Sequence, residues 1–391
     1  MKKHLLTAII GVSVIAAQGV KAETPTLEQL WEVIQQQEQE IEALKKEQAE
    51  TDVKIEATVE AIENGLESTD KSMEWASKTK VGGYGEHHFS NFEGKSDKVD
   101  AHRYVLFVGH EYSDTLRFFS EFELEHGIAG DDQPGEVELE QAFIEWDFAE
   151  NHSAVAGQFL VPVGILNETH EPDTFYGTER NLVEKNIIPT TWWETGVLFK
   201  GAIAPGVTYD IALHSGLENS VANIRSGRQK SAKAVANDFA YTARLKYTGI
   251  PGLELSTSYQ FQEDMSQGDL ADASASLLEA HAVYQTGPFA IRALWANWNI
   301  DGDEADIAGR DSQSGFYVEP SYRVTESLGV FARYSEWDNT AGLAGSEATD
   351  VVDFGVNYWV HPNVVLKADV TDYQDSDAND SLNLGVGWSF Y

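Results

Sequence analysis

The chain has 391 residues, no cysteine and a formal net charge of −37 at pH 7. Binding of a phosphate backbone requires clustered cations, so we do not expect nucleic acid as a partner. Without cysteine, disulfides, thiol catalysis and zinc–cysteine centres are excluded.

The first 22 residues are predicted to be a secretory signal peptide. Lys2 and Lys3 precede an apolar stretch over 5–17, and 20–22 resembles a cleavage site with small residues. This stretch is too short to cross a bilayer as a helix, and no later stretch reaches the required length of about 18–20 apolar residues. We therefore expect an exported protein that no transmembrane helix anchors.

Residues 23–66 are predicted to form an α-helical coiled coil, with 67–79 as a linker after Asn64-Gly65. Apolar side chains recur every seven residues there, which is typical of the a and d positions of a coiled coil. The two series are Leu27, Ile34, Ile41, Gln48, Ile55 and Ile62, and Leu30, Gln37, Leu44, Thr51 and Thr58. The alternative is a solvated single helix or a disordered acidic arm. The pattern is compatible with two or three helices in the coil.

Residues 80–391 divide into about 16 segments with alternating apolar and polar side chains. In 253–262, for example, Leu, Leu, Thr, Tyr and Phe alternate with Glu, Ser, Ser, Gln and Gln. The segments run for about 10–13 residues, longer than most soluble strands, and short turns alternate with long loops. These features predict an all-β membrane barrel of about 16 antiparallel strands, in preference to a soluble sandwich.

Tryptophans near the predicted strand ends are interpreted as the aromatic girdles of such a barrel. They are Trp146, Trp192, Trp193, Trp298, Trp337, Trp359 and Trp388.

The loop over 165–190 is the predicted pore constriction. It is long for an ordered connection, and its prolines, aromatics and mixed charges favour a loop folded into the lumen. The candidate constriction residues are Glu168, Glu171, Asp173, Tyr176, Glu179, Arg180 and Lys185.

The alternation of side chains also assigns charged residues of both signs to the inner wall. Opposed charges across a wide aqueous channel would order water and orient polar solutes; in the alternative, many of them pair as salt bridges within the wall. The predicted lumen-wall residues are Arg103, Arg117, Glu121, Glu123, Arg244, Arg292, Arg323 and Arg333.

A basic segment follows in the next long loop, where no acidic residue occurs between Asn219 and Asn237. It is a candidate funnel for anions at the mouth. It could equally pair with phosphates of lipopolysaccharide or with a neighbouring acidic loop. Its cations are Arg225, Arg228, Lys230 and Lys233.

Other chemistry is not predicted. Glu86, His87 and His88 are adjacent, but neighbouring residues of a strand face opposite ways, so we expect no metal site there. His–Ser pairs lie outside any G-x-S-x-G turn, and a phosphate-binding glycine loop is missing from the sequence. We expect neither a catalytic residue nor a cofactor.

Two segments on either side of the long loop carry a family resemblance. Gly-Gln-Phe-Leu-Val-Pro-Val-Gly at 157–164 and Trp-Trp-Glu-Thr-Gly-Val at 192–197 resemble the porin O/P-like family of phosphate-selective and related substrate-specific outer-membrane porins. The final Phe390-Tyr391 resembles the terminal aromatic signal of outer-membrane barrels. The resemblance implies a trimer of 16-stranded barrels with the third long loop folded inward. Phosphate-selective members carry a lysine ladder, and the few inward lysines here argue against phosphate selectivity.

The expected function is passive diffusion of small hydrophilic or charged solutes through the outer membrane of a Gram-negative bacterium. The expected partners are two further copies of the chain, membrane lipid and lipopolysaccharide. The alternative is a structural envelope protein, in which the barrel is an anchor and the periplasmic coil contacts peptidoglycan or another periplasmic partner. A carboxylate-rich lumen favours cations, whereas the inward arginines and the basic segment favour anions.

Overall fold

The computed structural model describes residues 26–130, 134–219, 223–268, 273–374 and 379–391. The predicted signal peptide, residues 1–22, lies outside these ranges. The chain divides into two compact units, Met1–Glu74 and Trp75–Tyr391, which we describe separately. Within the described residues, no helix combines the length and the apolar character needed to cross a bilayer.

Over its described residues the first unit is almost entirely helical, and its helix α1 (Leu27–Lys78) ends in the first residues of the second unit. The helix continues through the predicted linker over 67–79, because 67–78 are helical and Thr79 begins the first strand. A glycine inside a helix costs only about 1 kcal/mol relative to alanine, so Gly65 does not end so long a helix. The isoleucines of the heptad pattern are 47–56 % exposed in the single chain. This apolar stripe has the form a coiled coil requires, and the coiled coil stays a prediction.

Over its described residues, the second unit is a barrel of sixteen strands, with two short helices, α2 (Val183–Asn186) and α3 (Asp303–Ala308), in its loops. The strands are β1 (Thr79–Phe92), β2 (Lys98–Ser113), β3 (Leu116–Glu125), β4 (Val137–Ala149), β5 (His152–Leu160), β6 (Trp193–Ala204), β7 (Val207–His214), β8 (Ala240–Ile250), β9 (Leu253–Gln262), β10 (Ser274–Thr286), β11 (Phe289–Asp301), β12 (Ser312–Arg323), β13 (Leu328–Asp338), β14 (Thr349–His361), β15 (Val364–Tyr373) and β16 (Ser381–Phe390).

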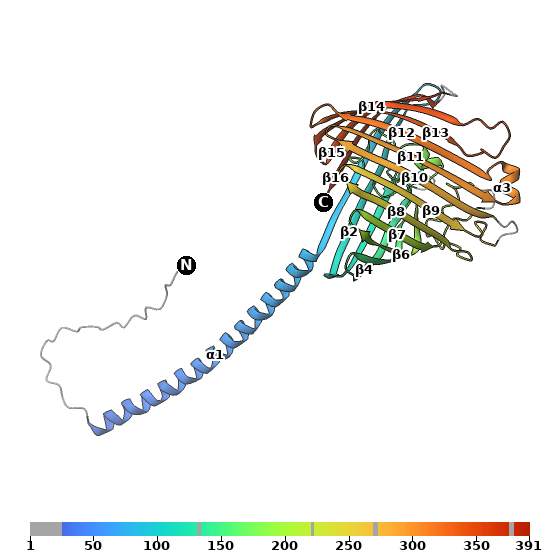
Figure 1. Cartoon of the computed structure of the whole chain (residues 1–391). Coiled ribbons are helices and arrows are strands. Elements are labelled where there is room, and N and C mark those ends of the chain that lie inside the picture. The colour runs from blue at the N-terminus through green and yellow to red at the C-terminus, as the bar shows by residue number, and fades with distance from the viewer. Residues whose placement is uncertain (1–25, 131–133, 220–222, 269–272, 375–378) are drawn as a thin grey trace. The chain divides into compact units, whose positions relative to one another are not determined.

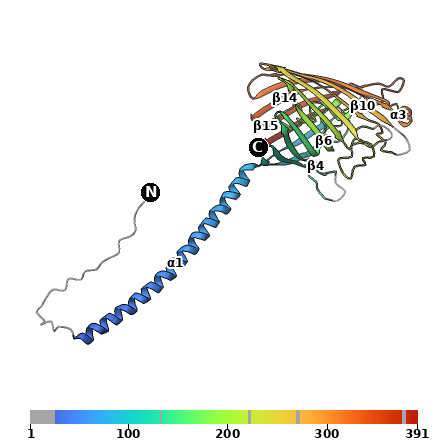
Figure 2. The same ribbon diagram turned by 60° about the horizontal axis from the view of Figure 1, so that its bottom comes forward.

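Every strand pairs antiparallel with its neighbours in sequence, and β1 closes the barrel by pairing with β16 (Figures 1 and 2). Gly83 lies opposite Phe390 and Phe92 opposite Ser381 along this seam. Closure leaves no unpaired sheet edge, which is the condition for a sheet to lie in hydrocarbon. The predicted fold is therefore confirmed.

The connections at the two ends of the barrel differ in length. Turns such as 205–206 and 251–252 join strands at the end where β1 begins and β16 finishes, whereas 161–192 and 215–239 extend from the other end. Gly252 has φ +79° in its turn, and a Cβ there would lie 2.1 Å from the carbonyl oxygen of Gln285. The turn thus requires glycine.

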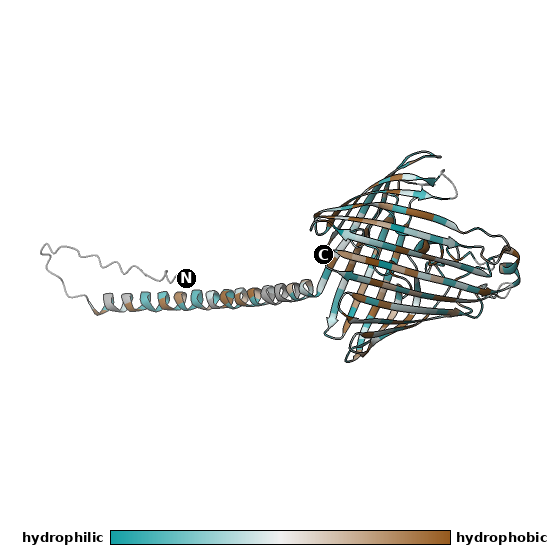
Figure 3. Cartoon of the chain, turned by 45° about the horizontal axis from the view of Figure 1, so that its top comes forward, coloured by the Kyte–Doolittle hydropathy of each residue, from teal (hydrophilic) through white to brown (hydrophobic). Residues whose placement is uncertain are grey.

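The predicted alternation is present in the barrel wall, as the bands along the strands in Figure 3 show. In β16, Leu382 and Leu384 are each 45 % exposed, whereas Asn383 between them is 5 % exposed. In β9, Leu255 and Tyr259 face outward and the intervening serines are buried. The apolar stripe faces lipid and the polar stripe faces the interior, as in membrane barrels.

The interpretation of the tryptophans as girdles is wrong at several positions. Trp192, Trp193 and Trp298 are at most 3 % exposed, and Trp359 is 8 % exposed. Trp146 remains on the outer surface with 53 % exposure. Trp192 belongs to the long loop inside the barrel, and two of the others contact it: Trp298 donates its indole N–H to the carbonyl of Ile187, and the ring of Trp359 meets that of Tyr176.

Candidate functional site

The interior is dominated by the connection 161–192, which crosses the lumen and is hydrogen-bonded to the wall. Arg103 of β2 donates to the carbonyl of His170 at 2.6 Å, and Trp298 of β11 donates to that of Ile187 at 2.8 Å. Further wall contacts come from β8, β9 and β12–β16. They are Arg244 with Glu168, Ser258 with Pro162, Tyr317 with Glu184, Arg333 with Tyr176, Asn357 with Phe175, Asp369 with Thr178, and Ser389 with Asp173.

Two buried polar side chains fix the shape of this loop. Asn167 donates to the carbonyls of Val161 and Trp192 and accepts the Trp192 amide, so it ties the two ends of the loop together. Glu184 is completely buried and accepts hydrogen bonds from the amides of Ile165 and Leu166.

Glu184 also accepts hydrogen bonds from two side chains. The Tyr317 hydroxyl of β12 donates to it at 2.9 Å, and the Asn181 amide donates at 3.1 Å. Burial raises the pKa of Glu184, although these bonds favour the charged form. The carboxylate of Glu184 therefore links several parts of the loop to β12 of the wall.

An apolar cluster anchors the loop on one side of the lumen. Val183, Ile187 and Trp192 of the loop pack with Leu277 of β10 and Trp298 of β11. The inner face of β10 and β11 is thus partly apolar, which departs from the expected polar lumen. The reason is that the loop covers this part of the wall and excludes water from it.

The predicted constriction residues lie along this loop. Glu179 contacts His88 at 3.2 Å, Asp173 accepts a hydrogen bond from Ser389 at 2.8 Å, and Glu168 pairs with Arg244. Tyr176 packs on the rings of Phe331 and Trp359, Arg180 and Lys185 line a cavity, and the carbonyl of Glu171 bonds Thr174 within the loop.

Most of the predicted lumen-wall residues are paired. Arg103 binds Glu86 at 2.6 Å, and Arg333 binds Glu319 at 2.9 Å. The other contacts are Arg117 with Glu145 and Asp147, Arg244 with Asp210, Arg292 with the carbonyl of Thr174, Arg323 over the ring of Trp359, and Glu121 with Tyr84 and Gln141. Glu123 is buried and lies opposite Glu138. Most of these arginines are thus neutralised by carboxylates of the same wall.

The basic segment turns toward the loop. Arg225 donates to the carbonyl of Thr190 at 3.0 Å, Arg228 donates to that of Thr191, and Arg180 donates to the Thr191 hydroxyl at 2.8 Å. These three side chains form an arginine cluster. Burial, followed by the positive charges of Arg228 and Arg180, lowers the pKa of Arg225 to about 10.

The two remaining cations of the segment differ from the arginines. Lys230 pairs with Glu136 at 2.8 Å and also with Glu138, whereas Lys233 is exposed. The geometry of Lys230 matches the alternative in which this loop pairs with an acidic neighbour.

Carboxylates of β3 and β4 lie within electrostatic range of the arginine cluster. Glu123, Glu138 and Glu140 bring carboxylate oxygens within 4.8 Å of one another, and with Glu121 they form a carboxylate row. Arg228 is attracted by Glu138 and Glu140. No sequence spacing places these groups together, because they come from β3, β4 and two separate loops.

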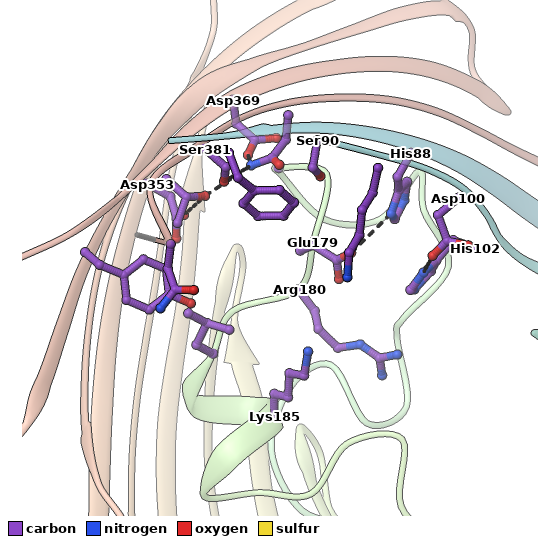
Figure 4. A pocket seen from close by; sticks show the side chains of 18 of the residues that line it. His88, Ser90, Asp100, His102, Glu179, Arg180, Lys185, Asp353, Asp369 and Ser381 are labelled. Atoms are coloured by element: carbon purple, nitrogen blue, oxygen red, sulfur yellow. Dashed lines mark hydrogen bonds and ion pairs between the residues drawn. The ribbon is translucent and has the colours of Figure 1, made fainter. Parts of the chain in front are cut away.

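A cavity of about 430 Å³ opens beside the loop (Figure 4). Glu179, Arg180 and Lys185 of the loop line one side, and His88, Asp100 and His102 of the wall line another. Asp353 and Asp369 of β14 and β15 complete a mixed-charge lining. Such a lining suits water and small charged solutes.

Comparison with known sequences decides the family. The family described as Gram-negative porin matches residues 110–378, well over half of the chain. This chain belongs to the Gram-negative porins. The porin is accordingly an outer-membrane channel for passive diffusion.

Other comparisons agree with this assignment. An uncharacterized protein of Aquifex aeolicus (strain VF5) is 28 % identical to the porin over 348 residues, which cover 79 % of each chain. Among solved structures, OmpF of Salmonella typhi in complex with daunomycin has a TM-score of 0.58 at 14 % identity, covering 80 % of this porin and 97 % of that chain. An anion-selective porin from Comamonas acidovorans also has a TM-score of 0.58, at 12 % identity, with 80 % and 99 % covered. At these identities the likeness concerns the fold.

Proposed function

We propose that the connection 161–192 forms the constriction of this channel and that small hydrophilic or charged solutes pass beside it. The observation that carries this proposal is the set of hydrogen bonds that hold the loop inside the lumen, from β8 and β9 to β16 and β2. A loop held in this way narrows the aqueous path.

Reconstitution of the full-length protein in planar bilayers tests this proposal. We expect discrete, ohmic conductance steps that are smaller than an unobstructed barrel of this size would give, because the loop fills part of the cross-section. Folded protein that inserts into the bilayer and carries no current would contradict the proposal.

The proposed path runs past the mixed-charge lining of the cavity beside the loop, which includes Arg180, Lys185, Asp353 and Asp369. Opposite charges on facing sides orient dipolar solutes and sort ions. Because carboxylates outnumber bases among the charged groups of the interior, we infer a mild preference for cations. Phosphate selectivity is not part of the proposal, since most interior arginines are paired with carboxylates.

We also propose a homotrimer with the coil in the periplasm and the outer apolar stripe in contact with lipid and lipopolysaccharide. A solved relative, OmpT of Vibrio cholerae, has been described in a trimer form. Within α1, the exposed isoleucines form an apolar surface that a second helix could cover. The hydroxyls of Thr51 and Thr58 donate hydrogen bonds to the backbone carbonyls four residues earlier, so they need no partner from that second helix. We also propose that the protein is related to the porin O/P-like group. The segments 157–164 and 192–197, which resemble that group and flank the inward loop, support this relation.

Deleting residues 23–74 separates the channel from the proposed role of the coil. We expect unchanged single-channel conductance, because the barrel unit begins at Trp75, and a lower yield of cross-linked trimer. Co-sedimentation with purified peptidoglycan, measured on both proteins, tests the alternative anchoring role. Loss of conductance in a variant that still folds would contradict the separation of the two units.

A further inference from the structure

Three histidines and two carboxylates meet on the wall of the cavity in Figure 4. His88 comes from β1, Asp100 and His102 from β2, His126 from the loop 126–136, and Glu179 from the loop 161–192. All five line the cavity, so an ion in the channel could reach them.

The side chains of this histidine cluster are in direct contact. The rings of His88 and His102 stack with centroids 4.5 Å apart, and His126 meets His102 edge-on at 5.6 Å. Nδ1 of His126 lies 2.9 Å from Oδ2 of Asp100, and Nδ1 of His88 lies 3.2 Å from Oε1 of Glu179.

The cluster contains two overlapping ligand sets. His88, His102 and Glu179 form one, and Asp100, His102 and His126 form the other. In each set the ligand atoms all lie within 4.8 Å of one another, so modest side-chain rotations would bring them to metal-bonding distance. Two imidazoles and one carboxylate are a recurrent ligand set of zinc and of non-haem iron, and it leaves a position for water.

The backbone holds His126 in an unusual conformation. Its φ is 49°, in the left-handed region that costs a non-glycine residue about 1–2 kcal/mol. Its amide donates to the carbonyl of His102 at 2.9 Å, which keeps the two histidines adjacent. Strain of this kind is concentrated at functional sites in proteins.

We propose that the histidine cluster is a binding site for one divalent transition-metal ion of the zinc class. One ion binds at a time, because both ligand sets need His102. Imidazole nitrogen selects such ions over Mg²⁺ and Ca²⁺, which prefer oxygen. This site was not predicted from the sequence, because the partners of His88 come from β2 and two loops rather than from its neighbours Glu86 and His87.

Isothermal titration of the full-length, tag-free protein in detergent with Zn²⁺ tests the proposal. We expect one ion per chain, and a loss of affinity of at least about 100-fold in His102→Ala, since even loss of an outer-shell partner costs about 10–100-fold. His361→Ala is the matched control, because His361 lies at the short-turn end of β14 and is exposed; its affinity should equal that of the wild type.

Further variants identify the ligand set in use. If Zn²⁺ affinity falls only in His126→Ala and Asp100→Asn, the ion binds to Asp100, His102 and His126. If it falls only in His88→Ala and Glu179→Gln, the ion binds to His88, His102 and Glu179. If wild-type protein binds no Zn²⁺, or if His361→Ala loses as much affinity as His102→Ala, the proposal is overturned. In that case the cluster is only an ion-pair network. The wild-type titration keeps this result independent of how the variants fold.

A second readout rests on the proposed function. Zn²⁺ added on the side of the long loops should lower the single-channel current of the wild type and leave that of His102→Ala unchanged. A current that Zn²⁺ does not alter, together with binding of one ion in the titration, would place the ion outside the conducting path and retain the site.

Discussion

Replacing Arg225 and Arg228 together by glutamine is expected to raise the cation-to-anion permeability ratio of the channel roughly 30-fold. Two unit charges about 8 Å from a permeating ion contribute about 1 kcal/mol in a water-like dielectric, against a cation and in favour of an anion, so their removal changes the ratio by about 2 kcal/mol. The measurement is the reversal potential in a salt gradient at low ionic strength, where screening is weak.

Lys233→Gln is the control for this double variant. Lys233 belongs to the same loop but is exposed, so the loss of its single charge should leave the reversal potential nearly unchanged. A shift of equal size in the control would mean that charge at the mouth, and not the arginine cluster, determines selectivity. No shift in the double variant would remove the arginine cluster from the ion path.

Glu184→Ala is expected to release the inward loop and to increase single-channel conductance. The substitution leaves the amides of Ile165 and Leu166 and the Tyr317 hydroxyl without their acceptor. Each buried donor left unpaired costs about 1–3 kcal/mol, so we expect a loss of about 3 kcal/mol or more in unfolding free energy. Conductance in planar bilayers and the unfolding midpoint in denaturant measure the two effects.

Glu150→Ala provides the matched control, because Glu150 is an exposed carboxylate in the turn between β4 and β5. It should change neither conductance nor stability. Glu184→Gln retains an acceptor oxygen and should fall between the wild type and Glu184→Ala. If Glu184→Ala conducts like the wild type while it is less stable, the loop does not limit the current.

The fold could be predicted because alternation of side chains acts locally. In 382–390, the outward Leu382 and Leu384 and the inward Asn383 follow directly from the pleat of a strand. The interior apolar face of β10 and β11 could not be recognised in the same way. Leu277 and Trp298 face inward only because a loop distant in sequence covers them.

The sequence predicted which loop forms the candidate site and which charged residues it carries. It did not predict which residues of the barrel wall these side chains contact. The mixed charges of 165–190 indicated an ordered inward loop, and the structure holds that loop inside the barrel. The partners of its residues are remote: Glu179 contacts His88 across 91 positions, and Tyr176 bonds Arg333 across 157. Only the closed wall brings such residues together, and no spacing along the chain encodes them.

The inward loop also touches both sides of the seam at which the first and last strands meet. Glu179 contacts His88 of β1, and Asp173 contacts Ser389 of β16. A segment from the middle of the polypeptide therefore holds the first and last strands together. We expect insertion of this loop and closure of the barrel to depend on each other during folding, and an intermediate in which the loop is not yet inserted should open most easily between β1 and β16.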